Sequence, residues 1–237
     1  MHNRVRQQRE YQRTYLGTVN GVDERLHTGS VTGGSALDQT LSATESGRGP
    51  KWTRRQSELF DRLVDLFLIE GFADLTLEDI AGRLRCSKST LYALAQSKEQ
   101  LAVAVVTHFF RRAASRVEKR VLAAGPDPRA RVVAYLTAVA DELRPASPDF
   151  QAAIADFPPG RAVYERNTRI AADRVRALIA EGVASGAFRD AHAEFVGEVA
   201  AVAMAGIQRG DVTARTGLTD AEAYAELATL VLHGVSA

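Results

Sequence analysis

Helix start signals recur along the chain with a spacing that is specific to helices. In a capping box, a Ser or Thr before the helix and a side chain three residues later each satisfy a free backbone N–H group. Four pairs have this spacing: Thr53 and Gln56, Thr76 and Asp79, Ser97 and Gln100, and Thr219 and Glu222. No alternation of apolar and polar residues lasts for more than a few positions, so no strand is predicted. The pattern therefore predicts an all-α protein.

The helical pattern begins at Lys51 and continues to the C-terminus. The first helix has an apolar stripe that includes Leu59, Phe60 and Leu63, and it stops at Gly71. Pro and Gly residues separate most of the later helices. The expected ranges are about 53–70, 77–84, 88–95, 98–122, 127–143, 148–157, 160–185, 191–208 and 219–235. We expect a small unit at 51–98 and a larger helical unit at 99–237.

Residues 1–50 differ in composition from the rest. They are rich in Gly, Ser and Thr and have no sustained period, so we expect a flexible, disordered extension. Arg4, Arg6, Arg9 and Arg13 make its start mildly basic. This arm either contacts DNA phosphates or has no function. In the second case it is a disordered extension or an artefact of an upstream start site.

The overall composition narrows the class of protein. The net charge of the 237 residues is +1, so binding to nucleic acid must rest on local charge. Cys86 is the single cysteine, which excludes an intrachain disulfide and suits a reducing cytoplasm. No apolar run is long enough to span a membrane, and the N-terminus does not resemble a secretory signal. We expect a cytoplasmic protein.

Two short helices joined by a tight turn, with a third helix packed across them, form a helix-turn-helix. The second of these helices is the one that enters the major groove of DNA. Here it lies within the segment CSKSTLYALAQSKEQL. If Leu91 faces the core, Ser89 and Ala93 point outward at about 100° per residue, with Thr90 and Tyr92 beside them.

That outward face is small, hydroxyl-bearing and cationic. Between Ile80 and Lys98 the charged residues are Arg83, Arg85, Lys88 and Lys98, a local charge of +4 with no carboxylate. Lysine and hydroxyl groups read base edges, and the remaining contacts go to phosphates. A solvated surface helix is the alternative, but the adjoining two-helix pattern favours DNA. Lys51, Arg54 and Arg55 at the start of the first helix could form a second edge that contacts phosphates. The residues expected to contact DNA are Arg54, Arg55, Thr76, Arg85, Ser87, Lys88, Ser89, Thr90, Tyr92 and Lys98.

Residues 53–110, roughly a quarter of the chain, resemble the DNA-binding domain of the TetR/AcrR family of one-component transcriptional regulators. The similarity follows LFLIEGFADLTLEDIAGRLRCSKSTLYALAQSKEQL. It depends on the Gly-Phe after the first helix, the Thr-capped helix with Asp-Ile-Ala, and the Ser-Lys-Ser-Thr-Leu-Tyr and Ser-Lys-Glu segments. The chain departs from the family at Arg85, where Gly is usual, and at Leu94 and Ala95, where a polar or aromatic residue and then Phe are usual.

The resemblance implies a two-fold dimer on a palindromic operator and a divergent C-terminal domain that binds a ligand. The dimer surface implied by the last two helices comprises Phe195, Val199, Val202, Gly206, Tyr224, Leu227 and Val231, although a place in the protomer core fits these residues equally well. An apolar, aromatic pocket for a hydrophobic small molecule would draw on Phe110, Tyr135, Val139, Phe150, Ile154, Phe157, Tyr164 and Thr168. The segment from Lys98 to His108 would couple ligand to DNA.

The alternatives are an enzyme and a protein-interaction bundle. The histidines, His2, His27, His108, His192 and His233, have no metal-ligand spacing, and no HExxH, phosphate loop or GxSxG occurs. A redox role for Cys86 is weaker than a role as small core filler. We therefore expect no enzyme, metal or cofactor. An interaction bundle whose helix-turn-helix no longer binds DNA is supported by Leu94 and Ala95 alone. The favoured function is a ligand-responsive repressor that acts as a homodimer.

Overall fold

The computed structural model describes residues 53–235, and every regular element in this range is a helix. The predicted all-α fold is confirmed for these residues, while the arm at 1–50 and Lys51 lie outside them. The helices are α3 (Arg54–Glu70), α4 (Leu77–Arg83), α5 (Lys88–Tyr92), α6 (Lys98–Ala123), α7 (Pro128–Leu143), α8 (Pro148–Ala155), α9 (Pro158–Ala184), α10 (Ala193–Gln208), α11 (Asp211–Thr216) and α12 (Asp220–Val235).

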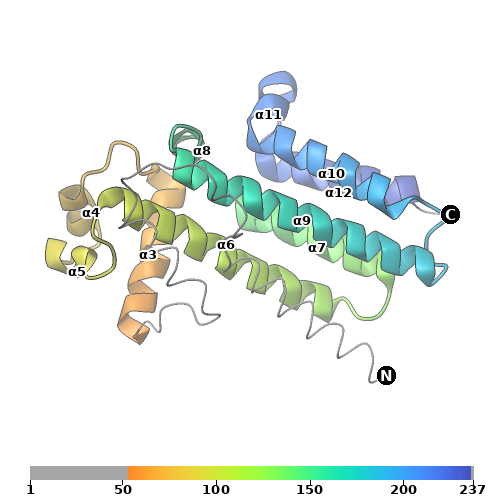
Figure 1. Ribbon diagram of the computed structural model, residues 1–237, viewed down its shortest axis with the longest axis horizontal. Helices are drawn as coiled ribbons and strands as arrows, with labels where there is room; N and C mark the ends of the chain where they lie inside the picture. Colours follow the sequence, from red (N-terminus) through yellow and green to blue (C-terminus); the bar gives the residue numbers. More distant parts are fainter. Residues whose placement is uncertain (1–52, 236–237) are drawn as a thin grey trace, which may run out of the picture.

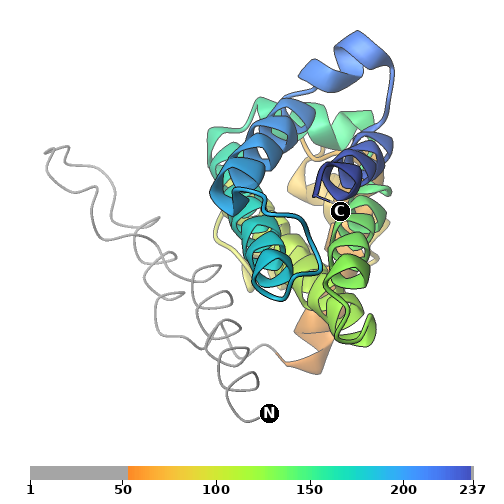
Figure 2. The same ribbon diagram turned by 90° about the vertical axis from the view of Figure 1, so that its right-hand side faces the viewer.

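The helices form a small unit at one end of an elongated bundle (Figure 1). Helices α3, α4 and α5 lie together at that end, and the long helix α6 leads from them into the bundle. There α6, α7 and α9 pack against one another, α10 lies on α9, and α12 lies on α7. The view along the long axis shows α10 and α12 side by side on the bundle (Figure 2). None of the helices between residues 53 and 235 is both long and apolar enough to cross a membrane.

The predicted caps explain where several helices begin. The Thr53 hydroxyl accepts the Gln56 N–H, and the Gln56 side chain accepts the Thr53 N–H. Thr76 with Asp79 and Thr219 with Glu222 form the same reciprocal pairs. The fourth pair is only half formed. Ser97 accepts the Gln100 N–H, but Gln100 Oε1 accepts from the Gln96 N–H at 3.0 Å instead of from Ser97.

Two predicted ranges need correction, and one helix was missed. The α5 helix ends at Tyr92 and not at 95, because the N–H groups of Leu94 and Ala95 both turn back to the Leu91 carbonyl. Helix α9 begins at Pro158, since proline suits the first turn of a helix, where its missing N–H costs nothing. Helix α11 was not predicted. Left-handed glycines, Gly210 and Gly217, stand on either side of it.

The end of α3 contacts the bundle directly. Gly71 has φ +70°, and a Cβ there would lie 2.9 Å from the Asp149 carbonyl oxygen, so this close approach requires glycine. The Ser147 N–H donates to the Leu68 carbonyl at 2.8 Å. The Phe72 ring packs edge-to-face on Phe150 and Phe157. The small unit is thus joined to the bundle by a buried aromatic contact as well as by α6.

Candidate functional site

The turn between α4 and α5 has an unusual backbone. The Cys86 N–H donates to the Ala81 carbonyl and the Arg85 N–H to the Gly82 carbonyl, which is the Schellman pattern at a helix end. Arg85 occupies the left-handed position at φ +50°, and it is the one residue other than glycine between 53 and 235 with a positive φ. This conformation costs a residue with a Cβ roughly 1–2 kcal/mol. The turn therefore keeps an arginine where glycine is the low-energy choice.

The outer face of α5 is open to solvent. Leu91 is 1% exposed and anchors the helix, whereas the Tyr92 ring is 52% exposed. Ser87 caps the helix by accepting the Thr90 N–H, and its hydroxyl also lies 2.7 Å from that of Ser89 and 2.8 Å from that of Thr90. Small hydroxyl groups and one aromatic ring thus form a surface that does not block approach to a groove.

Three of the expected cations are engaged within the protein. Lys88 Nζ donates to Glu78 at 2.7 Å, and this hydrogen bond raises the pKa of Lys88. Lys98 Nζ donates to the Ala73 carbonyl at 2.6 Å. Arg54 pairs with Glu58 one helical turn away, and Arg54 and Lys88 are exposed while Lys98 is half-buried. Ion pairs at such a surface contribute little and exchange readily with a phosphate.

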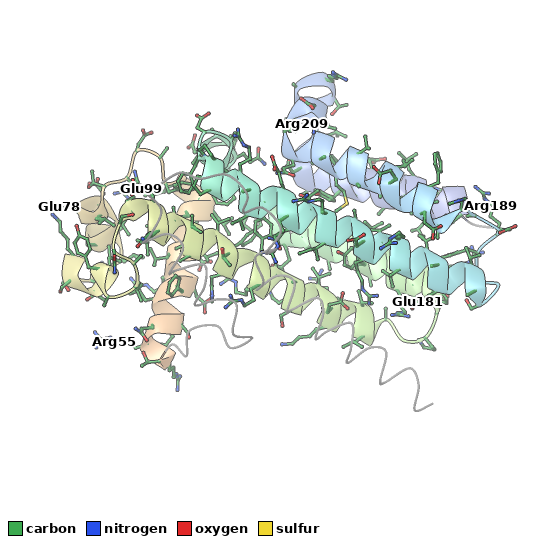
Figure 3. The ribbon with its side chains drawn as sticks, viewed as in Figure 1. Arg55, Glu78, Glu99, Glu181, Arg189 and Arg209 are labelled. Atoms are coloured by element: carbon green, nitrogen blue, oxygen red, sulfur yellow. The ribbon has the colours of Figure 1, made fainter. Side chains whose placement is uncertain are left out.

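Two other arginines keep their side chains unpaired. Among residues 53–235, no hydrogen bond or ion pair holds the guanidinium of Arg85 or that of Arg55, and both side chains are exposed. Figure 3 shows Arg55 at the outer end of α3 and Glu78 at the same end of the molecule as α5. These are the cations most available to a phosphate.

Thr76 and Cys86 have local roles in this unit. The Thr76 hydroxyl lies 2.5 Å from Asp79 Oδ2, a hydrogen bond that lowers the pKa of Asp79, so Thr76 is occupied as a cap. Burial raises the pKa of the Cys86 thiol, which the charge of Arg62 only partly opposes. A raised thiol pKa is the opposite of what a reactive cysteine needs.

A second feature is a cavity of about 60 Å³ in the bundle, between α6, α7 and α9, with α10 and α12 closing it. Its walls are mainly apolar and aromatic. Five of the residues expected at a ligand site line it: Phe110, Tyr135, Val139, Tyr164 and Thr168. The Phe110 and Tyr164 rings meet edge-to-face with their centroids 5.1 Å apart.

The other three expected ligand residues do not line this cavity. Phe150 and Phe157 pack against Phe72 at the junction with α3, and Ile154 lies beside Gly160 at the start of α9. These apolar side chains pack at contacts between helices. In the sequence, apolar residues with that role cannot be distinguished from apolar residues that line a pocket. The prediction did not include Glu142 and Asn167, which line the cavity, because nothing in the sequence distinguishes them from surface residues.

An exposed apolar strip runs along α10. Phe195 is 67% exposed, Val199 48% and Val202 64%, and they border a shallow hollow on the outer face of the helix. Leu230 on α12, which the sequence analysis did not single out, is 70% exposed. The residues that lie within the protomer instead are Gly206, Tyr224, Leu227 and Val231. Their burial fits the alternative of a place in the protomer core.

Within the part of the chain that the structure describes, no group of three or more His, Cys, Asp or Glu side chains could hold a metal ion. His108 is engaged in the α3–α6 contact, where its Nε2 lies 3.1 Å from Asp61 Oδ1. His192 caps α10 by accepting the Phe195 N–H on Nδ1. These histidines hold helices in place.

Comparison with known proteins identifies the small unit. Residues 59–105 match the family described as bacterial regulatory proteins, tetR family. This range contains the α4–α5 helix-turn-helix. No curated protein matches the chain in sequence.

Solved structures share the fold of the whole described region. A transcriptional regulator from Cytophaga hutchinsonii ATCC 33406 is 18% identical, with a TM-score of 0.62 over 78% of this chain and 100% of that chain. A protein from Saccharomonospora viridis in complex with choline is 17% identical, with a TM-score of 0.62 over 78% of this chain and 100% of that chain. A TetR/AcrR regulator from Thermobifida fusca YX-ER1 is 24% identical, with a TM-score of 0.54 over 77% of this chain and 98% of that chain. The helix-turn-helix unit is thus similar in sequence to the tetR family of bacterial regulatory proteins, and the described region shares the fold of solved transcriptional regulators.

Proposed function

We propose that the chain is a cytoplasmic, ligand-responsive repressor that binds a palindromic operator as a homodimer. The observation that carries the proposal is the exposed face of α5 beside Arg85. A strained backbone persists where the surrounding structure and a function both maintain it. A contact between this unpaired arginine and a phosphate at the edge of the major groove would explain why an arginine occupies the strained position.

Replacing Arg85 by glycine tests this proposal without harming the turn. Glycine adopts the left-handed conformation without strain, so Arg85→Gly removes the charge and keeps the fold. In a gel-shift assay with DNA from its own promoter region, we expect weaker binding and a salt dependence whose log–log slope is smaller by about 0.9, for one lost phosphate contact. Arg215→Gly, an exposed arginine on the distant α11, is the matched control and should bind as the wild type does.

The recognition helix is tested by Lys88→Ala and Tyr92→Ala. Both should weaken binding, and unchanged affinity in both would remove α5 from the interface. Lys98→Ala should weaken binding to all sequences alike, because a phosphate contact carries no sequence information. The alternative function, a bundle whose helix-turn-helix no longer binds DNA, predicts that even the wild type gives no shift. The exposed hydroxyls and cations of α5 favour DNA over that alternative.

The homodimer is supported by the apolar strip on α10. A single recognition helix contacts few base pairs, so a pair of helices is needed for a selective site. Exposed aromatic and aliphatic side chains in one strip indicate a protein interface. Phe195→Asp should convert the protein to a monomer in analytical ultracentrifugation. Leu122→Asp, an exposed leucine on α6 away from the strip, is the control and should leave the assembly state unchanged.

The ligand response is supported by the cavity and by the fold. The S. viridis protein, which shares this fold, is in complex with the small molecule choline. Helix α6, which follows α5 directly, forms part of the wall of the cavity. An effector bound there would reach the DNA-binding unit through a single helix.

A further inference from the structure

The electrostatic character of the bundle cavity is one-sided. Among the described residues that line it, Glu142 is the one that carries a charge at neutral pH, and no Lys, Arg or His reaches the wall. Phe109 and Tyr224 join Phe110, Tyr135 and Tyr164 as five aromatic rings around it. The face of an aromatic ring is negative and attracts cations. Both the rings and the charge therefore favour a positive guest.

Three polar side chains of the wall donate hydrogen bonds within the protein. The Tyr135 hydroxyl donates to the Ala171 carbonyl at 3.2 Å, and the Asn167 amide donates to the Val163 carbonyl at 2.8 Å. The Thr168 hydroxyl lies within donating distance of the Tyr164 carbonyl at 3.1 Å. The Tyr135 and Thr168 hydroxyls therefore offer a ligand oxygen lone pairs. The one charged side chain of the wall is a carboxylate, so the wall fits an anion poorly.

Glu142 retains acceptor capacity although it is paired. Arg116 Nε and Nη2 donate to its two oxygens at 2.8 and 2.6 Å. Arg116 is 47% exposed and Glu142 is 14% exposed, so the guanidinium approaches from the solvent side. A carboxylate has about four lone-pair sites, and two of them remain after a bidentate contact.

A second buried carboxylate, that of Asp220, lies one helical turn from Tyr224, a residue of the wall. Asp220, in the first turn of α12, is 6% exposed, and within residues 53–235 no hydrogen bond or ion pair reaches its side chain. Its charge acts on both Tyr164 and Tyr224, which line the cavity. A buried carboxylate without a counter-ion is costly, and a cation in the cavity reduces that cost.

We propose that this cavity binds a small organic cation with a methylated ammonium group, held by the aromatic rings and by the Glu142 carboxylate, with the buried charge of Asp220 as a further attraction. A volume of about 60 Å³ admits about four to six non-hydrogen atoms, at roughly 10–15 Å³ for each water-sized group. Tetramethylammonium has that size. The site stands on its own geometry, and only the role of the cation as effector rests on the proposed repressor function.

Isothermal titration calorimetry with the full chain tests the site. Tetramethylammonium should bind at least tenfold more tightly than tert-butanol, a neutral molecule of almost the same shape, because cation–π contacts in a dry site favour charge. Acetate, an anion whose four non-hydrogen atoms are within the size that the cavity admits, should not bind. Equal affinity for the three compounds, tighter binding of tert-butanol or acetate, or no binding of tetramethylammonium would overturn the proposal.

Two variants remove one negative charge each. Glu142→Gln and Asp220→Asn should each weaken tetramethylammonium binding by about tenfold while leaving tert-butanol unaffected. Asp141→Asn is the matched control. Its carboxylate pairs with Arg120 and Arg144, outside the lining of the cavity, so binding should be unchanged. If all three variants bind as the wild type does, the carboxylates play no part and the proposal fails.

Gel shifts on the same preparations separate this proposal from the repressor function. Wild-type protein that shifts DNA but binds no tetramethylammonium would contradict the cation site alone. Protein that binds tetramethylammonium but never shifts DNA would contradict the repressor function and leave the site standing. A fall in DNA affinity when tetramethylammonium is added would support both.

Discussion

Asp220→Asn should stabilise the protein, and the structure indicates by how much. Burial raises the pKa of Asp220 from its ordinary value of 3.8 to about 6. Each pKa unit corresponds to about 1.4 kcal/mol, so ionised Asp220 lowers the free energy of unfolding by about 3 kcal/mol at pH 8. The favourable interaction of a negative charge with the N-terminus of a helix offsets about 0.3–1 kcal/mol of this destabilisation. Asparagine has the same shape and no charge, so the expected gain is about 2–3 kcal/mol.

The pH dependence gives this prediction a sign that a packing effect lacks. Between pH 3.8 and about 6 the folded protein binds a proton that the unfolded chain has lost, so the contribution of Asp220 to stability falls as the pH rises. The contribution is fully present below pH 3.8 and is lost above about pH 6. The difference between the variant and the wild type should therefore be largest at pH 8 and close to zero near pH 4.

Urea denaturation followed by circular dichroism at 222 nm measures this difference. Both proteins are compared at one concentration, because a dimer's apparent stability depends on concentration. All other titrations are common to the two proteins and cancel in the difference. A variant that is less stable than the wild type at pH 8, or a difference that does not change with pH, would refute the reasoning.

Three further substitutions test packing, charge burial and capping by the same urea assay. Gly182→Ala should destabilise the protein by about 1–3 kcal/mol, since its Cβ would lie 2.0 Å from the buried ring of Phe188; no loss would mean that the ring moves freely. Arg174→Met should cost about 3–5 kcal/mol by leaving the Glu118 carboxylate buried without its two hydrogen bonds, and adding Glu118→Gln should recover part of that loss. Thr76→Ala should cost about 1 kcal/mol through the lost capping box, and a larger loss of DNA affinity than of stability would indicate a direct DNA contact as well.

The features that the sequence predicted well are local ones. Thr76 begins α4 because its hydroxyl and the Asp79 side chain bond within four residues, which needs no knowledge of the rest of the fold. Leu91 is buried because it is the aliphatic residue of a short, otherwise mainly polar helix, so it is the side chain by which the helix packs on the core. The outward direction of Ser89 and Tyr92 then follows from helical geometry.

The features that it missed depend on packing between distant segments. The Lys88–Glu78 pair joins residues ten apart through a turn that no spacing rule describes. Tyr224 looks like an interface residue because α12 has an apolar stripe, but only the packing of α12 on α7 decides that the stripe points inward. Asp220 reads as an ordinary acid in the first turn of a helix, and its burial depends on how α12 docks.

Helix α6 connects the two parts of the proposed mechanism. It begins at Lys98, whose Nζ bonds to the loop before α4, and it lines the cavity from Phe109 onward. Midway, His108 and Arg112 both contact Asp61 of α3, at 3.1 and 3.0 Å. A guest that moves α6 therefore also acts on α3 through Asp61, and on the end of α6 that follows α5. Because coupling between two binding sites is reciprocal, operator DNA should weaken cation binding by the same factor by which the cation weakens DNA binding.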